Sequence, residues 1–274
     1  MAKSAILKSS ITKKYWMAFT GLFLCIFLLG HLAGNMQLIF GDALQFNQYA
    51  LFMTTNPAVK ALSYLTYASL LFHAIDGILL TIQNKKARPI DYARNRPEAN
   101  SRWASRNMAI LGSLILIFIV LHMKTFWAVM HFDEKIPLQT TMIEVQPGMP
   151  AQEFYLTTTG SYMPMGNVEV RNVTEFYDPA AKVKIADGYK DLYKITVDFF
   201  KDPEYGLVFT LLYVLSMFVL MFHLLHGVAS AFQSIGINSG KYKRTIRVLA
   251  KIFAVVVPLL FAIIPLYIHF FLKA

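Results

Sequence analysis

The sequence has few charged residues and a single cysteine. Charged residues make up 15% of its 274 residues and hydrophobic residues make up 56%, whereas about a quarter of a soluble domain is charged. This balance excludes an ordinary soluble domain and predicts a membrane protein. Because Cys25 is the only cysteine, the chain can form no internal disulfide and has no CxxCH motif for covalent haem. An iron–sulfur cluster held by four cysteines would have to belong to another subunit.

Lysine and arginine are absent from residues 41–59, although the chain has a net charge of +10. The positive charge gathers in the N-terminal tail, in 84–106 and near 236–251, in short stretches between apolar runs. This pattern indicates membrane topology and not a nucleic-acid surface. It predicts that the N-terminus, 84–106 and 236–246 are cytoplasmic, and that 41–60, 132–204 and the C-terminus lie outside.

Five apolar runs reach the length that crosses a bilayer, which is about 20 residues. They occupy roughly 16–40, 61–83, 107–131, 205–235 and 247–272. The basic N-terminus resembles a signal peptide, but the first run is too long and lacks a small-residue cleavage site. We therefore expect an all-α membrane protein with five transmembrane helices, the first of them retained.

The segment 132–204 is the longest connection between the apolar runs. It is acidic on balance and rich in Gly, Pro, Tyr and Thr, with short alternating pieces at 167–173 and 182–185 that suggest β-hairpins. We interpret it as an outer lid or spacer without chemistry of its own. The chain then divides into 1–131 (tail and helices one to three), 132–204 (insertion) and 205–274 (helices four and five).

Histidines recur inside the apolar runs. A lone histidine in a membrane span is costly, and it is as readily a structural residue bonded to a carbonyl as a ligand. Here each of the first four runs carries at least one, and four helices that each donate an inward ligand can build a cofactor site. The candidates are His31, His73, His122, and His223 or His226. Two others, His131 and His269, lie near the outer boundary and are interpreted as interfacial.

Neutral imidazole ligates zinc, copper or haem iron. The candidate histidines are spread over separate helices, and small residues that suit the flat porphyrin lie near most of them: Gly30, Gly34, Gly77, Gly112 and Gly227. This favours two b haems, each held by two histidines. The first four helices would then form a haem-binding bundle.

Depth suggests how the histidines pair. His31 and His122 each lie about 15 Å below the outer end of their runs, so we pair them around an outer haem. His73 is deeper and is paired with His226 around an inner haem. The depth of His223 matches His73 better, and spacing alone does not choose between these two histidines one turn apart.

Several polar side chains near the runs are candidates for cofactor contacts. Lys124 follows His122 by two residues and either snorkels outward or meets a haem propionate. Trp103 and Arg106 precede the third run, where they either anchor the interface or hold the propionates of the inner haem. Asp76, three residues after His73, is either a functional carboxylate or bonded to a neighbouring helix.

Four segments, taken together, resemble one protein family. They are TGLFLCIFLLGHLAGN, LLFHAIDG, WASRNMAILGSLILIFIVLH and LMFHLLHG, in this order on helices one to four. The resemblance is to the single large cytochrome b subunit of succinate:quinone oxidoreductases, of the dihaem type found in menaquinone-linked succinate dehydrogenases and fumarate reductases.

The resemblance implies a haem ligand at each of the four matching positions: His31, His73, His122 and His226. It implies an electron-transfer subunit that does not itself act on succinate, in a bacterial cytoplasmic (inner) membrane. The implied partners are a flavoprotein subunit, an iron–sulfur subunit and a quinone, with menaquinone expected. It implies no nucleic acid and leaves oligomerisation of the complex open.

Two departures from the family pattern bear on proton transfer. Some menaquinol fumarate reductases have a glutamate two residues before the fourth histidine, where this chain has Leu224. The acidic residue assigned to quinol oxidation also has no clear counterpart after helix one. Two other functions remain open: a dihaem b subunit of a formate dehydrogenase or hydrogenase, and a non-haem transporter with histidines along its path.

Overall fold

The structure is a computed structural model that describes residues 10–87, 96–237 and 239–273. Lys3, Lys8, Arg88 and Arg94, which contribute to the expected charge asymmetry, lie outside the described residues. Five helical segments are long and apolar enough to cross a membrane, which confirms the five expected spans. They are α2 with α3 (Ser10–Asn35 and Gln37–Phe40), α5 (Pro57–Lys86), α8 with η1 and α9 (Met108–His122, Met123–Ala128 and Val129–Phe132), α11 (Gly206–Ser234) and α12 (Gly240–Phe270).

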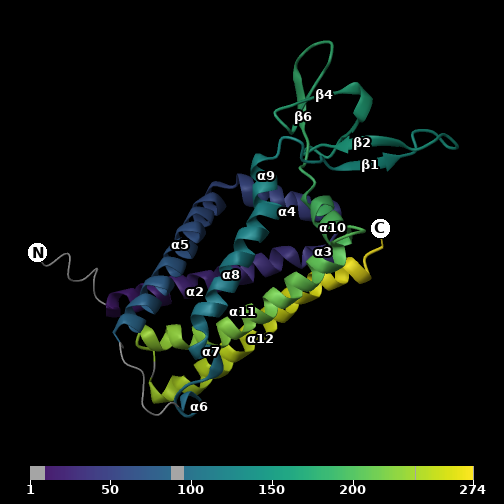
Figure 1. Ribbon diagram of the computed structural model, residues 1–274. Helices are drawn as coiled ribbons and strands as arrows, with labels where there is room; N and C mark the ends of the chain where they lie inside the picture. Colours follow the sequence, from purple (N-terminus) through teal and green to yellow (C-terminus); the bar gives the residue numbers. More distant parts are fainter. Residues whose placement is uncertain (1–9, 88–95, 238, 274) are drawn as a thin grey trace, which may run out of the picture.

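The first four spans surround a common interior. Helix α2 packs against α5 and α11, and α8 packs against the same two helices, so each span touches two neighbours (Figure 1). Helix α12 lies outside this ring, along α11 and α2. Its Ala250 and Ala254 are buried against Leu224 and Val228 of α11, because small side chains let two membrane helices approach closely.

The sequence predicts only a connection between the first two spans. The structure has a helix in that connection, α4 (Ala43–Thr55). The Asp42 side chain caps it by accepting a hydrogen bond from the Gln45 amide at 2.8 Å. Asn56 then starts α5 by accepting from the Ala58 amide at 2.9 Å, with Pro57 at the first helical position. Two further short helices, α6 (Pro97–Asn100) and α7 (Trp103–Arg106), precede α8.

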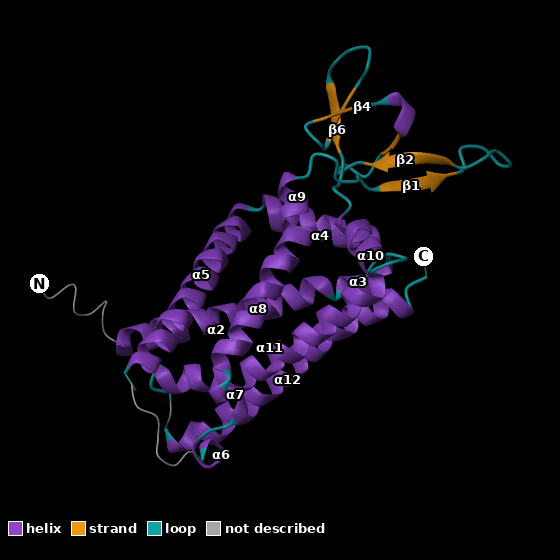
Figure 2. Cartoon of the chain, in the orientation of Figure 1, coloured by secondary structure: helices purple, strands orange, loops and turns teal. Residues whose placement is uncertain are grey.

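The insertion between α9 and α11 contains two small antiparallel sheets (Figure 2). One has the order β1-β2-β3 (Thr140–Ile143, Gln152–Leu156, Tyr162–Pro164), and the other has the order β4-β5-β6 (Glu169–Arg171, Glu175–Tyr177, Lys184–Asp187). A short 3-10 helix, η2 (Met165–Asn167), links them. The expected β-structure is confirmed, although the sequence indicated only the regions of β4 and β6.

Ion pairs stabilise the second sheet. Glu169 accepts hydrogen bonds from Arg171 at 2.9 Å and from Lys182 at 3.0 Å. The hydrogen bonds from Arg171 and then Lys182 lower the pKa of Glu169 to about 2. The ion pairs that the structure shows between described residues lie within 132–204, in the sheets and in α10 (Leu192–Lys201), the last helix of this segment.

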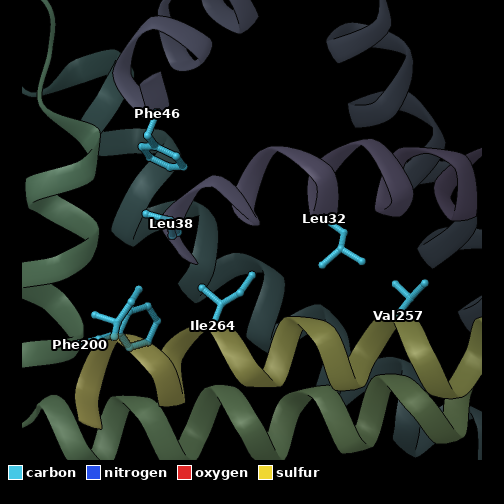
Figure 3. Close-up of a cluster of buried hydrophobic side chains, with 7 residues drawn as sticks. Leu32, Leu38, Phe46, Phe200, Val257 and Ile264 are labelled. Carbon is cyan, nitrogen blue, oxygen red and sulfur yellow. The ribbon is translucent and has the colours of Figure 1, made fainter. Parts of the chain in front are cut away.

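A buried apolar cluster joins the insertion end of the bundle to α10. Figure 3 shows Leu32 and Leu38 from the first span facing Val257 and Ile264 of α12. The cluster also includes Phe46 of α4, Phe200 of α10 and Ile268 of α12. Helices α4 and α10 are therefore packed onto the spans, which fixes the insertion to one end of the bundle.

Asn47 connects α4 to the insertion through hydrogen bonds. Its side chain is 1% exposed, donates to Asp191 Oδ1 at 2.8 Å and to Gln139 Oε1 at 3.2 Å, and accepts from the Tyr193 amide at 2.9 Å. We expect Asn47→Ala to destabilise the docked insertion by about 1–3 kcal/mol, because buried partners lose their hydrogen bonds. Limited proteolysis of the insertion at rising temperature measures this loss. The exposed neighbour gives the control Gln48→Ala, and an equal effect there would contradict the role of Asn47.

Candidate metal-binding site

The first histidine pair joins α2 to α8. His31 lies on α2 and His122 is the last residue of α8, and their ring centroids are 5.8 Å apart with the planes nearly perpendicular, at 87°. The two histidines are 91 residues apart in the sequence and lie on different spans. The expected proximity of His31 and His122 is therefore present in the structure.

Aromatic rings enclose this pair. Phe27 stacks on His31 at 5.3 Å and Phe261 lies 5.7 Å from it. On the other side, Phe118, Phe126 and Tyr213 lie 5.7, 5.4 and 6.0 Å from the His122 ring. These rings pack the two imidazoles in place, and two polar groups reach their nitrogens. The Asn35 amide nitrogen is 3.4 Å from Nδ1 of His31, and the Tyr213 hydroxyl is 3.4 Å from Nδ1 of His122.

The second pair joins α5 to α11. The ring centroids of His73 and His223 are 6.3 Å apart, with an interplanar angle of 69°. The described ring contacts do not place His226 beside His73, which differs from the expected pairing. His223 and His226 are three residues apart, which places them one turn apart on the same face of α11, about 60° around the helix from each other. The ring contact to α5 is made by His223.

The surroundings of His73 determine which of its nitrogens carries a proton. Its Nδ1 lies 3.3 Å from the Met17 carbonyl oxygen, which can only accept a hydrogen bond. The Thr20 hydroxyl is also 3.3 Å away, and its own proton is directed to the carbonyls of the preceding turn. Nδ1 of His73 is therefore the donor, and Nε2 keeps its lone pair free for a metal.

His223, the other member of the second pair, differs from His73 at Nδ1. Its Nδ1 is a buried nitrogen without a hydrogen-bond partner in the part of the chain that the structure describes. Unpaired buried polar atoms are rare in folded proteins and call for an explanation, one of which is a missing ion or water.

The two pairs lie at two levels of the bundle. On α2, Gly21 contacts the second pair and His31 belongs to the first, ten residues later, which is about 15 Å along a helix. On α11, Tyr213 and His223 are also ten residues apart.

A methyl group at Gly21 would come within 3.0 Å of His73 Cε1, so a larger residue there would displace this imidazole. Thr20 and Gly21 were not singled out in the sequence, although they interrupt the apolar run at this depth.

The geometry of both pairs suits two ligands of one metal. With metal–nitrogen bonds of about 2 Å, two imidazoles on opposite sides of a metal have centroids about 6 Å apart. The distances of 5.8 and 6.3 Å agree with this value. Within 10–87, 96–237 and 239–273, no group of three or more His, Cys, Asp or Glu side chains is arranged to hold a metal.

The space beside the glycines differs from one position to another. No atom lies within 4 Å of a Cβ placed on Gly30, Gly77 or Gly227, so these positions border open space. At Gly34 the same Cβ would overlap the Tyr49 ring. The expectation that Gly34 leaves room for a cofactor beside His31 stays a prediction, although Tyr49 of the unforeseen α4 lies against this glycine.

The charged candidates Lys124 and Asp76 differ in their position relative to the pairs. Lys124 lies in the π-helix η1 and is exposed, and no hydrogen bond or ion pair joins it to another described residue. Asp76 has no hydrogen bond or ion pair to another described residue, although it is close enough to His73 for an electrostatic interaction. These positions agree with a snorkelling Lys124 and leave Asp76 near the second pair.

Helix α7 packs against α11. Trp103 meets Phe222 edge to face, with ring centroids 5.5 Å apart, and Phe222 directly precedes His223 in the sequence. The Arg106 guanidinium contacts the Ser101 carbonyl oxygen. Arg102, which precedes α7, is close enough to His226 for an electrostatic interaction. His226 thus belongs to a basic and aromatic group near α7.

The two boundary histidines lie outside both pairs. Nδ1 of His131 is 2.8 Å from the Trp127 carbonyl oxygen, and Nδ1 of His269 is 2.7 Å from the Phe200 carbonyl oxygen. Both imidazoles therefore donate to the main chain, which agrees with their interpretation as interfacial residues.

Comparisons with protein-family models, with curated proteins and with solved structures gave no match for this chain. The fold and the site thus define a multi-pass helical membrane protein with two facing histidine pairs. Any more specific function has to be inferred from this geometry and from the sequence motifs.

Proposed function

We propose that this chain is a dihaem cytochrome b that anchors a succinate dehydrogenase or fumarate reductase complex in a bacterial cytoplasmic membrane. The observation that supports it best is the pair of facing imidazoles at each of two levels, with centroid distances of 5.8 and 6.3 Å. The four family-like segments support the specific type of complex.

The ligands we propose are His31 with His122, and His73 with His223. The last choice departs from His226, which the sequence resemblance implies, because His223 is the α11 histidine whose ring faces His73. Two b haems bound by these pairs would supply one-electron transfer between the iron–sulfur subunit and a membrane quinone, with menaquinone the expected species.

The residues of this chain orient both proposed centres. The Met17 carbonyl oxygen keeps a proton on Nδ1 of His73, and the aromatic rings around His31 and His122 exclude water from the first centre. Trp103 and Arg106, near the second centre, are proposed to contact the haem propionates, and open space at Gly30, Gly77 and Gly227 to accommodate the cofactors.

The basic side of the chain is the proposed docking face for the flavoprotein and iron–sulfur subunits. The first turns of α12 carry the exposed cations Lys241, Arg244 and Arg247, which have no ion-pair partner among the residues described. The positive-inside rule assigns this face to the cytoplasm and the insertion to the outside.

Purification of the native complex from its membranes tests this function. We expect a flavoprotein and an iron–sulfur subunit to copurify, with two b haems per chain that succinate reduces or fumarate reoxidises. Copurification with a formate- or hydrogen-oxidising subunit would assign the chain to another oxidoreductase. A reduced-minus-oxidised spectrum without a b-type α band would leave the transporter as the better explanation.

A further inference from the structure

The first histidine pair has one phenol beside it. The Tyr213 hydroxyl oxygen lies 3.4 Å from Nδ1 of His122, and the two rings are 6.0 Å apart. This hydroxyl contacts no other polar group of the chain as far as the structure describes it. Tyr213 is on α11, which gives the second pair its His223, but it belongs to the level of the first pair.

Aromatic contacts fix the Tyr213 ring. It meets Phe118 of α8 edge to face at 5.0 Å, and it packs in the same way on Phe199 and Phe200 of α10 at 5.7 and 5.0 Å. Phe126 of η1 lies 6.4 Å away. Because rings from three elements surround it, the position of the hydroxyl is set by packing and does not depend on its contact with His122.

A phenol can donate or accept a hydrogen bond, and the two arrangements differ in consequence. If Tyr213 accepts from Nδ1 of His122, Nε2 keeps its lone pair for a metal. If Tyr213 donates, the proton of the neutral imidazole is on Nε2, which can then bind no metal. The second pair shows which arrangement this chain uses at its other level, since Nδ1 of His73 faces a carbonyl oxygen and must donate.

We propose that Tyr213 is a positioning residue for His122: its hydroxyl accepts the Nδ1 proton and so directs Nε2 toward the proposed haem iron. This inference rests on the proposed function. An acceptor on the distal nitrogen makes a ligating imidazole more basic, which stabilises the oxidised metal and lowers its reduction potential. Tyr213 would thus set the potential of one haem and leave the other unaffected.

Tyr213→Phe in the purified complex tests this role, because it removes the hydroxyl and keeps the packed ring. We expect the midpoint potential of one haem to shift to a higher value, with an altered low-spin ferric EPR signal for that haem alone. We also expect its occupancy to fall under haem limitation, since loss of such a partner weakens metal binding by about 10- to 100-fold. The unshifted haem reports that the variant has folded.

Tyr67→Phe is the matched control, because the Tyr67 hydroxyl lies on α5 and accepts from Trp127 Nε1 at 2.8 Å, away from both pairs. Unchanged potentials in Tyr213→Phe, or the same shift in Tyr67→Phe, would overturn the role of Tyr213 while two haems still support the proposed function. A wild-type complex without haem would overturn both.

Discussion

His31→Ala and His122→Ala are each expected to remove the same single haem and to leave the other in place. An isolated imidazole cannot complete a bis-histidine centre, so loss of either member removes the site, while the second pair lies about 15 Å away along the helices. Haem content per purified complex should fall from two to one in both variants. Because the two residues act as a unit, the double variant should lose no more haem than either single variant.

Two histidines outside the pairs provide the controls for this prediction. His131→Ala and His269→Ala remove imidazoles that donate to main-chain carbonyl oxygens, and both variants should keep two haems. Redox potentiometry then identifies which centre is missing. If His31→Ala and His122→Ala deplete different haems, the proposed pairing across α2 and α8 is wrong.

Hydropathy and residue type were sufficient to predict part of this structure. Spanning helices have to be long and apolar, so all five spans could be located, although α12 begins at Gly240, seven residues before the expected start at 247. His31 and His122 could be matched by depth, because both lie a similar number of residues before the outer ends of their spans. Such features depend on local sequence and on the dimensions of the bilayer.

Features that depend on tertiary packing could not be predicted in this way. Helix α4 is short and interfacial, so it gives no spanning signal, and without it Tyr49 could not be placed against Gly34. Tyr213 is one aromatic residue in an apolar run until α8 and α10 bring Phe118 and Phe200 around it. The π-helix η1 directly after His122 is a local irregularity of a kind often found at functional sites, and no residue in it signals a wider turn.

The choice on α11 is the point at which the sequence resemblance and the geometry disagree. The resemblance implies His226, which precedes Gly227, whereas the ring of His223 is the one 6.3 Å from His73. Nδ1 of His223 is buried without a partner among the described residues, while His226 lies near Arg102 at the end of the bundle. The ring distance is the observation that favours His223 as the ligand.

His223→Ala is therefore expected to remove the haem that His73→Ala also removes, while His226→Ala keeps two haems. The comparison is closely matched, because the two histidines are one turn apart on one helix and both variants delete the same side chain. Haem content, with potentiometry to identify the remaining centre, measures the outcome. Loss of that haem from His226→Ala with full retention in His223→Ala would show that α11 is rotated in the loaded protein and that the resemblance identifies the fourth ligand correctly.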